Sequence, residues 1–320
     1  MNAPVSEPTV SAIGPHSATL FTHADGVYFG LSDVAYHADP ALGSTDIKRL
    51  AYDPEGWWHD SVLNPDREPE DDTPARIFGR AVHKVVLEGR DAFHARYGRC
   101  SFPGNVKAGK EERAAFEEAG KASLKADDFD RVLTAGAAIK GNPHLADAFS
   151  GGYPEVSVFW TADGIRRKCR MDYVKVRATT DLKSIRPQRP TSFDTNCRRA
   201  LSDYRYDVQA AHYIAGRRAG IDLIQAGQFD GEPEPAWLDR LQADAAFVIV
   251  FYQAEGAPLT WGCAISPENP LLEIAKVTIR QAEENFRDFA ATFGPAVPWL
   301  RPAPLDELDI SQLPRWHGND

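Results

Sequence analysis

The sequence predicts an α/β fold in which a central mixed β-sheet is flanked by helices and preceded by an α-helical N-terminal section. Three observations predict it. Residues 153–183 alternate apolar and polar positions on both sides of Asp163-Gly164, a dipeptide that favours a two-residue hairpin turn. Residues 245–251 are almost all apolar, as is typical of a strand covered on both faces. Much of the remaining chain has helical apolar spacing, so a single α/β domain is expected.

The part of the chain before the hairpin is expected to be mainly helical. Ser44-Thr45-Asp46 is a typical helix start, Pro54 either ends that helix or begins the next, and Asn142-Pro143 indicates a break within a helical region. The expected elements are a disordered segment at 1–26, an aromatic stretch at 27–29, helices from 44 and from 54, an acidic loop at 64–74, helices at 75–87 and 91–97, a loop at 98–108, and helices within 109–149.

The part after the hairpin combines helices with two further strands. The expected elements are a Pro-containing loop at 184–192, helices at 193–201 and 204–219, strands at 245–253 and 259–265, and a helix at 271–293. These elements indicate one domain over residues 27–293, followed by a Pro/Trp-rich tail at 294–320.

The composition is that of an ordinary water-soluble protein, with 43% hydrophobic and 26% charged residues among 320. No apolar run approaches the ~20 residues needed to span a bilayer, and the N-terminus lacks the pattern of a signal peptide. The four cysteines lie far apart, without the C-x2-C spacing of zinc or iron–sulfur sites. We therefore expect a cytoplasmic protein with reduced thiols and no membrane partner. The absence of G-x-S-x-G and P-loop motifs argues against a serine hydrolase and an ATP-driven enzyme.

Positive charge is concentrated in one part of an otherwise acidic chain. The net charge is −10, yet residues 166–218 contain 14 Lys and Arg against 5 Asp and Glu, whereas the rest of the chain contains 22 against 41. A local basic patch in an acidic protein indicates a surface for a phosphodiester substrate, and a solvated basic face is the alternative explanation.

The hairpin is expected to bring acidic residues together. A turn at Asp163-Gly164 pairs positions whose numbers sum to 327, so Glu155 lies opposite Asp172. If the chain turns again near residues 176–177, paired numbers sum to 353 and Asp172 also lies opposite Asp181. This second turn contains no Gly, Asn or Pro that would favour it.

Asp172, Asp181 and Lys183 form the expected catalytic set, because side chains two residues apart on a strand share a face. Carboxylates packed together repel unless a cation lies between them, and Mg²⁺, or Mn²⁺ in its place, prefers such oxygen ligands. The Leu182 carbonyl can supply another oxygen, and Glu155 can complete the metal site or bind a second ion. A lysine there can orient or deprotonate the attacking water and stabilise the transition state. The alternative is a set of acids on an exposed sheet face without any metal.

His83 is a further candidate metal ligand. It lies in the helix predicted at 75–87, and Gly79 lies four residues earlier on the same face. A glycine there is expected to let the helix approach the sheet, so that His83 reaches the metal. The alternative is a hydrogen-bonded histidine at the edge of the core.

The helix predicted at 204–219 carries Tyr206, Gln209 and Tyr213 along one side. An amide and phenols at these positions can contact phosphate oxygens or hold a catalytic side chain, which makes Gln209 and Tyr213 candidate catalytic residues. The candidate DNA contacts are Tyr206, Arg198, Arg199 and Arg205. Polar tips on an amphipathic helix, and solvated arginines, are the alternatives.

Together these motifs resemble those of the PD-(D/E)XK nuclease superfamily, which carries an acid on one strand and an acid-x-Lys on the next. Its RecB-type branch adds a G-x3-H helix, an acid on the preceding strand and a Q-x3-Y helix. The matching residues are Met171-Asp172, Asp181-Leu182-Lys183, Gly79 and His83, Glu155, and Gln209 and Tyr213, with Met171 in place of the usual proline. Over about residues 28–290 the chain most resembles the exodeoxyribonuclease VIII (RecE-like) nuclease domain, in the segments YHADPALGSTDIKRLAYDPEGWW, IFGRAVHKVVLEGRDAF, EVSVFW and YRYDVQAAHY.

The resemblance implies a restriction-endonuclease-like core and a Mg²⁺-dependent exonuclease that degrades linear duplex DNA from 5′ ends, leaving 3′ tails for recombination. The site it implies has Lys183 as the catalytic lysine and, as metal ligands, His83, Asp172, Asp181 and the Leu182 carbonyl. It also implies a ring-shaped homotetramer and a single-strand annealing protein as partner. Two alternatives stay open. One is a repair or Cas4-like nuclease acting on single strands or flaps, against which the missing cysteine cluster speaks. The other is a non-catalytic subunit that binds DNA ends.

Overall fold

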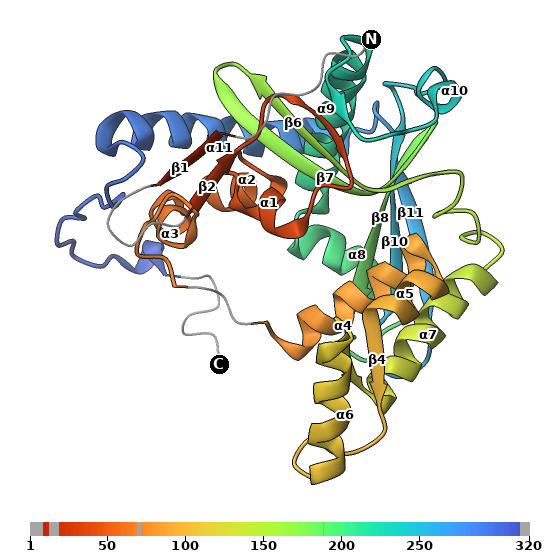
Figure 1. The fold of residues 1–320 in the computed structure, drawn as a ribbon. Coiled ribbons are helices and arrows are strands. Elements are labelled where there is room, and N and C mark those ends of the chain that lie inside the picture. Colours follow the sequence, from red (N-terminus) through yellow and green to blue (C-terminus); the bar gives the residue numbers. More distant parts are fainter. Residues whose placement is uncertain (1–8, 13–18, 69–71, 188, 314–320) are drawn as a thin grey trace.

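The computed structural model describes residues 9–12, 19–68, 72–187 and 189–313, and a seven-stranded mixed sheet forms its centre (Figure 1). The strands of this sheet are β3 (Gly26–Phe29), β6 (Gly152–Ala162), β7 (Ile165–Lys175), β8 (Ala178–Ile185), β9 (Phe229–Asp230), β10 (Ala246–Gln253) and β11 (Thr260–Ile265). Their order is β11-β10-β8-β7-β6-β3-β9, with β8–β10 and β3–β9 parallel and the other pairs antiparallel. The predicted α/β fold with a central mixed sheet is therefore confirmed.

Helices cover both faces of this sheet. The first layer contains α2 (Ser44–Leu50), α3 (Pro54–Asp60), α8 (Phe193–Asp203), α9 (Tyr206–Gln225) and α11 (Leu271–Phe293). The second contains α4 (Pro74–His83), the π-helical turn η1 (Lys84–Glu88), α5 (Arg90–Arg96) and α7 (Ala126–Gly141). Strand β10 contributes Ile249 to the hydrophobic core between the sheet and the first layer, and Val250 to the second core, between the sheet and the second layer. This confirms the prediction that the strand is covered on both faces.

The β6–β7 hairpin forms in the predicted register. Its turn residues Asp163 and Gly164 have φ angles of 52° and 75°, the left-handed conformation that this dipeptide tolerates. Along the ladder, the numbers of paired residues sum to 327, as predicted. Glu155 therefore faces Asp172, although the ladder is interrupted at that one pair.

The turn between β7 and β8 also forms where it was predicted, and its paired residues sum to 353. A distant side chain stabilises it in place of turn-forming residues. Arg217 of α9 is 3% exposed and donates hydrogen bonds to the carbonyls of Lys175 and Val176 at 2.8 Å and of Ala178 at 3.1 Å. Burial lowers the pKa of Arg217 to about 10, so it remains a cation at neutral pH. The turn thus depends on tertiary contacts that its own sequence does not reveal.

The N-terminal segment is more structured than predicted. The sequence predicts disorder over residues 1–26, but the described part of this segment contains the antiparallel strands β1 (Thr9–Ala12) and β2 (Thr19–Thr22) and the buried His23. The rest of the segment lies outside the described residues. The prediction used composition alone, and composition gives no sign of the buried contact that His23 makes.

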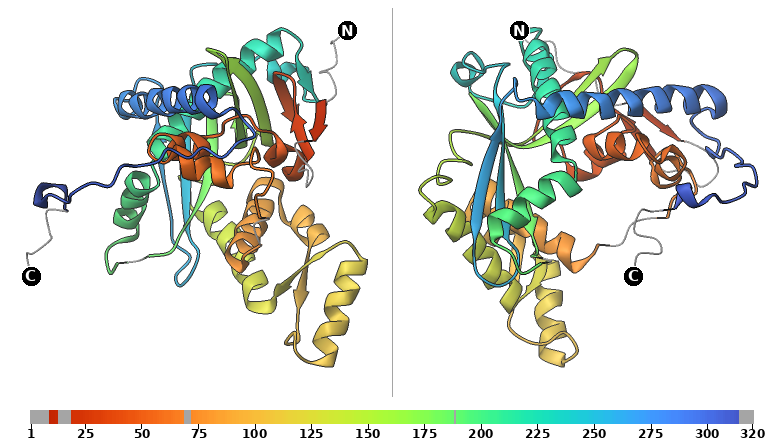
Figure 2. Two further views of the ribbon diagram at one scale, coloured as in Figure 1. Left: turned by 90° about the vertical axis from the view of Figure 1, so that its left-hand side faces the viewer. Right: turned by 180° about the vertical axis from the view of Figure 1, so that it is seen from behind.

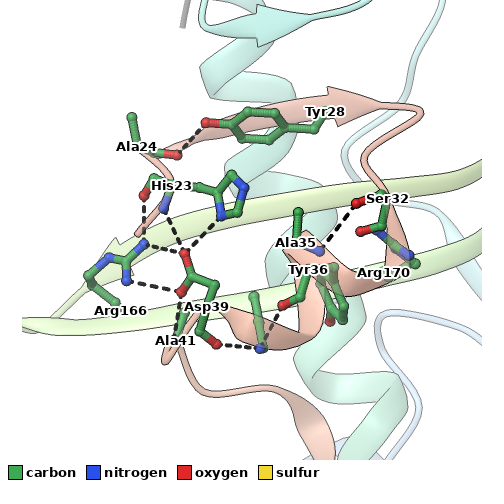
Figure 3. A network of polar contacts seen from close by, with 11 residues as sticks. His23, Ala24, Tyr28, Ser32, Ala35, Tyr36, Asp39, Ala41, Arg166 and Arg170 are labelled. Carbon is green, nitrogen blue, oxygen red and sulfur yellow. Dashed lines mark hydrogen bonds and ion pairs between the residues drawn. The ribbon is translucent and has the colours of Figure 1, made fainter. Parts of the chain in front are cut away.

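That contact is a network around Asp39, which is fully buried (Figure 3). His23 N and Nδ1 lie 2.7 and 3.0 Å from Asp39 Oδ2, and Arg166 Nη1 of β7 lies 3.1 Å from Asp39 Oδ1. Burial would raise the pKa of Asp39, but the hydrogen bonds from His23 and Arg166 outweigh it and lower the pKa to about 2. The network connects His23 and Asp39, which lie before and after α1 (Asp33–Ala38), with Arg166 of the hairpin.

The region between α5 and α7 differs from the prediction. β4 (Tyr97–Cys100) and β5 (Ala122–Lys125) form a parallel pair where the sequence predicts a loop and a helix, and α6 (Lys107–Glu118) projects beside them (Figure 1). Strands of four residues are too short to show a clear alternation. The predicted break at Asn142-Pro143 is confirmed, because α7 ends at Gly141.

The chain after α11 returns to the first layer. Trp299 is 1% exposed, and its ring packs against those of Trp57, Phe286 and Phe289 at centroid distances of 5.2, 5.9 and 5.5 Å. Between Trp299 and residue 313, where the described part of the chain ends, the chain extends away from the body and forms the short turn η2 (Ile310–Gln312) (Figure 2). In the described part of the chain, no helix combines the length and the apolar character needed to cross a bilayer.

Candidate active site

Three residues from three elements bring possible metal ligands together, and we call them the donor group: His83, Glu155 and Asp172. His83 is the last residue of α4, a helix that begins with Pro74 after the N-capping residue Thr73. Glu155 lies on β6 and Asp172 on β7. One donor atom from each lies within 4.8 Å of the other two, and His83 Nδ1 is 3.7 Å from Asp172 Oδ2.

Glu155 reaches this position through an irregular backbone. Its φ angle is +51°, in the left-handed region that residues other than glycine seldom occupy. The β6–β7 ladder is interrupted at Glu155 and Asp172, while the pairing on either side keeps the same register. A strained backbone conformation costs free energy and persists only where the surrounding structure enforces it. Such conformations occur preferentially at functional sites.

Strands β7 and β8 separate where the acids lie. Their pairing extends only to Tyr173 and Thr180, and beyond that point Asp172 Oδ2 accepts a hydrogen bond from Leu182 N at 2.8 Å. The N–H and C=O of one strand residue point to the same side of the strand. The Leu182 carbonyl therefore faces the side on which Asp172 lies, as its predicted role as a ligand requires.

Asp181 lies beside the donor group and is held from the opposite layer of helices. It is 1% exposed, and Gln209 Nε2 of α9 donates a hydrogen bond to its Oδ1 at 2.7 Å. Lys183 Nζ lies 2.8 Å from Asp181 Oδ2, but the geometry of this ion pair leaves Oδ2 without a directed hydrogen bond from any described residue. The structure thus brings Asp181, Lys183 and Gln209 together, as the sequence predicts.

The crowded charges change the pKa of several groups. Burial, and to a smaller extent Asp172, raise the pKa of Glu155 to about 8. The pKa of Asp181 is raised to about 6. Burial is the largest cause and Asp172 adds to it, whereas Lys183 acts in the opposite direction. Burial lowers the pKa of Lys183, but Asp181 and Asp172 outweigh burial and hold it above its ordinary value, so Lys183 is an ammonium. Three carboxyl groups, those of Glu155, Asp172 and Asp181, therefore lie close enough together to raise one another's pKa.

Lys48 is a site residue that the sequence analysis missed. Its Nζ lies 5.3 Å from the centre of the Tyr206 ring, and Lys183 Nζ lies 5.3 Å from the same ring. Burial, and then the neighbouring Lys183, lower the pKa of Lys48 to about 8. Asp46 fixes α2 by accepting hydrogen bonds from Gly43 N and Trp57 Nε1, both at 2.8 Å. Only the packing of α2 on α9 reveals Lys48, since its segment predicts no more than a helix start.

The remaining predicted residues contact other parts of the protein. Tyr213 is buried with its ring 5.5 Å from that of Phe247, and burial raises the pKa of its hydroxyl well above the ordinary value. Arg198 pairs with Asp194. Arg205 pairs with Asp207, and Arg199 has one buried nitrogen, Nη1, without a hydrogen-bond partner. Among the described residues, none of these three arginines makes a hydrogen bond or ion pair with the donor group.

The reason predicted for Gly79 is wrong. A Cβ atom added to Gly79 would meet no other atom within 4 Å, so α4 does not need a glycine there to approach the sheet. Phe78, Ala81 and Val82 instead pack the helix into the second core. Gly79 lies on a side of α4 that is not closely packed.

The donor group fits a divalent metal ion. It offers one imidazole nitrogen and carboxylate oxygens within 4.8 Å of one another, and the buried Asp181 Oδ2 next to it lacks a directed hydrogen bond. The carboxylate oxygens of such a site suit Mg²⁺ or Mn²⁺. Ionised carboxylates this close together repel one another, and a bound cation relieves that repulsion.

The fold and this site together define a nuclease-like α/β protein, and comparisons with known proteins agree. Residues 60–226, just over half of the chain, match the family described as "PDDEXK-like domain of unknown function (DUF3799)". The chain belongs to this family, and with it to the PD-(D/E)XK nuclease superfamily, so the predicted superfamily and its fold are confirmed. The closer resemblance to exodeoxyribonuclease VIII stays a prediction.

One solved structure supports the fold from a distance. A crystal structure of a "Putative exonuclease" from Eubacterium rectale superposes with a TM-score of 0.51 over 81% of this chain and 86% of that chain. The two sequences are 16% identical, so the similarity shows a shared fold and no more. No curated protein matches the chain.

Proposed function

We propose that the protein is a Mg²⁺-dependent exodeoxyribonuclease that hydrolyses linear duplex DNA from its 5′ ends and leaves 3′ single-stranded tails for recombination. One observation carries the proposal: the ammonium of Lys183 lies 2.8 Å from the buried Asp181, beside the donor group. Hydrolysis needs a cation that stabilises charge at the phosphate as the bond breaks. A site that only bound DNA ends would have no need for such a lysine between acids, so this observation favours an enzyme.

The residues of the site have distinct roles in this proposal. His83, Glu155 and Asp172 would hold the metal ion, with Asp181 Oδ2 and the Leu182 carbonyl as further oxygen ligands. The ion would lower the pKa of a bound water and offset the charge of the phosphate. Lys183, as an ammonium, donates hydrogen bonds to phosphate oxygens and orients the water, while Gln209 keeps Asp181 in place through the 2.7 Å hydrogen bond.

The test of activity uses linear duplex DNA labelled at its 5′ or 3′ ends, incubated with Mg²⁺, with Mn²⁺, and with a chelator. We expect early release of the 5′ label in the presence of either metal. Covalently closed circles should stay intact. Cutting of closed circles would contradict an exonuclease. Early release of the 3′ label would reverse the proposed polarity.

The same assay separates the proposal from its two alternatives. A repair or flap nuclease would degrade single strands or flaps and leave blunt duplexes intact. A DNA-end-binding subunit would shift linear DNA in a gel without releasing any label, with or without metal. The lysine-acid pair favours the enzymatic alternatives over the binding subunit.

A pair of substitutions tests the site itself. Lys183→Ala and Asp181→Asn should each lower the cleavage rate by about 10²–10³-fold, because each removes electrostatic stabilisation of the transition state. DNA affinity should change little, since other basic residues still neutralise phosphates. Lys276→Ala, the same change at an exposed lysine of α11, is the control and should leave the rate unchanged. Undiminished cleavage by Lys183→Ala would remove Lys183 from the site.

The assembly and partners belong to the same proposal. We propose a ring-shaped homotetramer around DNA and a single-strand annealing protein as partner, in the cytoplasm, on the basis of the resemblance to the exodeoxyribonuclease VIII family. Light scattering on the purified protein measures its oligomeric state directly, and a monomer at micromolar concentration would contradict the ring.

A further inference from the structure

Two tyrosines outside the site described above are open to solvent. Tyr52 is 72% and Tyr204 is 54% exposed, whereas the other eight tyrosines of the chain are buried or half-buried. Tyr52 follows α2, and Tyr204 lies at the junction of α8 and α9. Both tyrosines lie next to Arg205, Tyr52 through its hydroxyl and Tyr204 as the preceding residue of the chain.

A short chain of contacts connects Tyr204 to the lysine of the site. The rings of Tyr204 and Tyr206 lie 5.8 Å apart with an angle of 32° between their planes. The Tyr206 ring in turn lies 5.3 Å from Lys183 Nζ. An aromatic surface that solvent can reach is therefore one ring away from the ammonium expected to contact the scissile phosphate.

Arg205 connects the neighbourhoods of the two exposed tyrosines. It adopts a left-handed backbone conformation, with φ 50° and ψ 53°, between Tyr204 and Tyr206. Its guanidinium donates a hydrogen bond to the Tyr52 hydroxyl at 3.1 Å and another to Thr278 Oγ1 at 3.0 Å. The exposed Tyr52 ring is thus anchored through its hydroxyl, and the exposed Tyr204 ring packs on that of Tyr206. Rings held in this way lose less entropy when a ligand binds to them.

Lys48 adds an available positive charge beside the Tyr206 ring. Its Nζ lies 5.3 Å from the centre of the Tyr206 ring, and it makes no ion pair with any described residue. Aromatic rings combined with unpaired cations are the chemistry that binds single-stranded nucleic acid, because bases stack on the rings while phosphates meet the cations. Paired bases inside a duplex cannot offer their faces to such rings.

We propose that Tyr52 and Tyr204 form a stacking platform for unpaired nucleobases at the entrance of the site, so that the strand being cut reaches Lys183 unpaired. This inference rests on the proposed function, since it names the form in which that site receives its substrate. A duplex end must open by one or more base pairs before the strand is cut.

The experiment measures binding without cleavage, by fluorescence anisotropy in the presence of a chelator. The probes are a labelled single-stranded oligodeoxynucleotide and an abasic strand of equal length, which keeps the phosphates and lacks the bases. The wild type should bind the strand with bases more tightly. Tyr204→Ala and Tyr52→Ala should each reduce that preference by about tenfold, a typical effect of one lost stacking contact, and should leave the affinity for the abasic strand nearly unchanged.

Matched variants decide between stacking and other causes. Tyr204→Phe keeps the ring and should keep the preference, and Phe102→Ala, which removes an aromatic ring that is 52% exposed elsewhere, should have no effect. Equal loss of affinity for both strands in Tyr204→Ala and Tyr52→Ala, or no loss for either strand, would overturn the platform.

Because this assay requires no cleavage, it is independent of the test of activity. A protein that cuts no DNA but prefers strands with bases would disprove the proposed function and retain the platform. A protein that cuts linear DNA but binds both probes equally would support the proposed function and disprove the platform.

Discussion

At neutral pH Glu155 holds a proton that a metal ion must displace, and Asp181 holds one below about pH 6. Burial, helped in each case by Asp172, raises the pKa of Glu155 from 4.5 to about 8 and that of Asp181 from 3.8 to about 6. The folded protein therefore binds more protons than the unfolded chain between about pH 4 and pH 8, and the contribution of these two groups to stability declines as the pH rises through that interval. A bound cation reverses this decline by compensating the carboxylates once they ionise.

We accordingly expect Mg²⁺ or Mn²⁺ to raise the melting temperature more at pH 8 than at pH 6. Thermal unfolding with and without metal at the two pH values measures this difference. In Glu155→Gln, which cannot ionise at this position, the difference between the two pH values should shrink. A larger metal effect at pH 6 than at pH 8 would contradict the assignment of Glu155 and Asp181 to the metal site.

Individual residues were predictable where local sequence carries the signal. The alternation around Asp163-Gly164 determines which residues face each other, and this was enough to place Glu155 opposite Asp172. Lys48 and Tyr52 could not be found in the same way, because their neighbours come from α9 and the α8–α9 junction, far along the chain. The φ angle of Glu155 was equally hidden, since nothing in its sequence marks a left-handed residue.

Among the elements, the β7–β8 turn shows how far a distant residue can determine local structure. Arg217→Met should destabilise the protein by about 3 kcal/mol or more, because it leaves buried carbonyls of the turn without a donor. Urea unfolding measures the loss. Arg218→Met is the matched control on the same helix: Arg218 is half exposed and pairs with Asp244 at the surface, so its loss should cost no more than about 1 kcal/mol. Equal effects of the two changes would mean that the turn does not need Arg217.

Several long elements followed their sequence patterns, and the shortest strand pair did not. The helix at 271–293 and the strands at 245–253 and 259–265 lie within a residue or two of their predicted ends. β4 and β5 went unpredicted because each has four residues and is stabilised by pairing with the other rather than by its own pattern.

On the scale of the whole molecule, the segment after α11 helps to close the first layer. Trp299→Ala should cost about 3–5 kcal/mol of unfolding free energy, since it empties a space among Trp57, Phe286 and Phe289. Leu300→Ala, one residue further on, is the control: Leu300 is 68% exposed, and the change should have little effect. If both variants unfold at the wild-type urea concentration, Trp299 has no part in the core.

The donor group also joins two parts of the chain that fold in different layers. His83 projects from the helical layer that contains α4 and α7, while Glu155 and Asp172 project from the sheet. An ion coordinated by residues of both parts would stabilise the contact between this helical layer and the sheet. Amide hydrogens of α4 and η1 should then exchange with deuterium more slowly when Mn²⁺ is added, whereas those of α11, on the far side of the sheet, should keep their rates. The cation expected to serve the chemistry would then also stabilise the packing of α4 and η1 against the sheet.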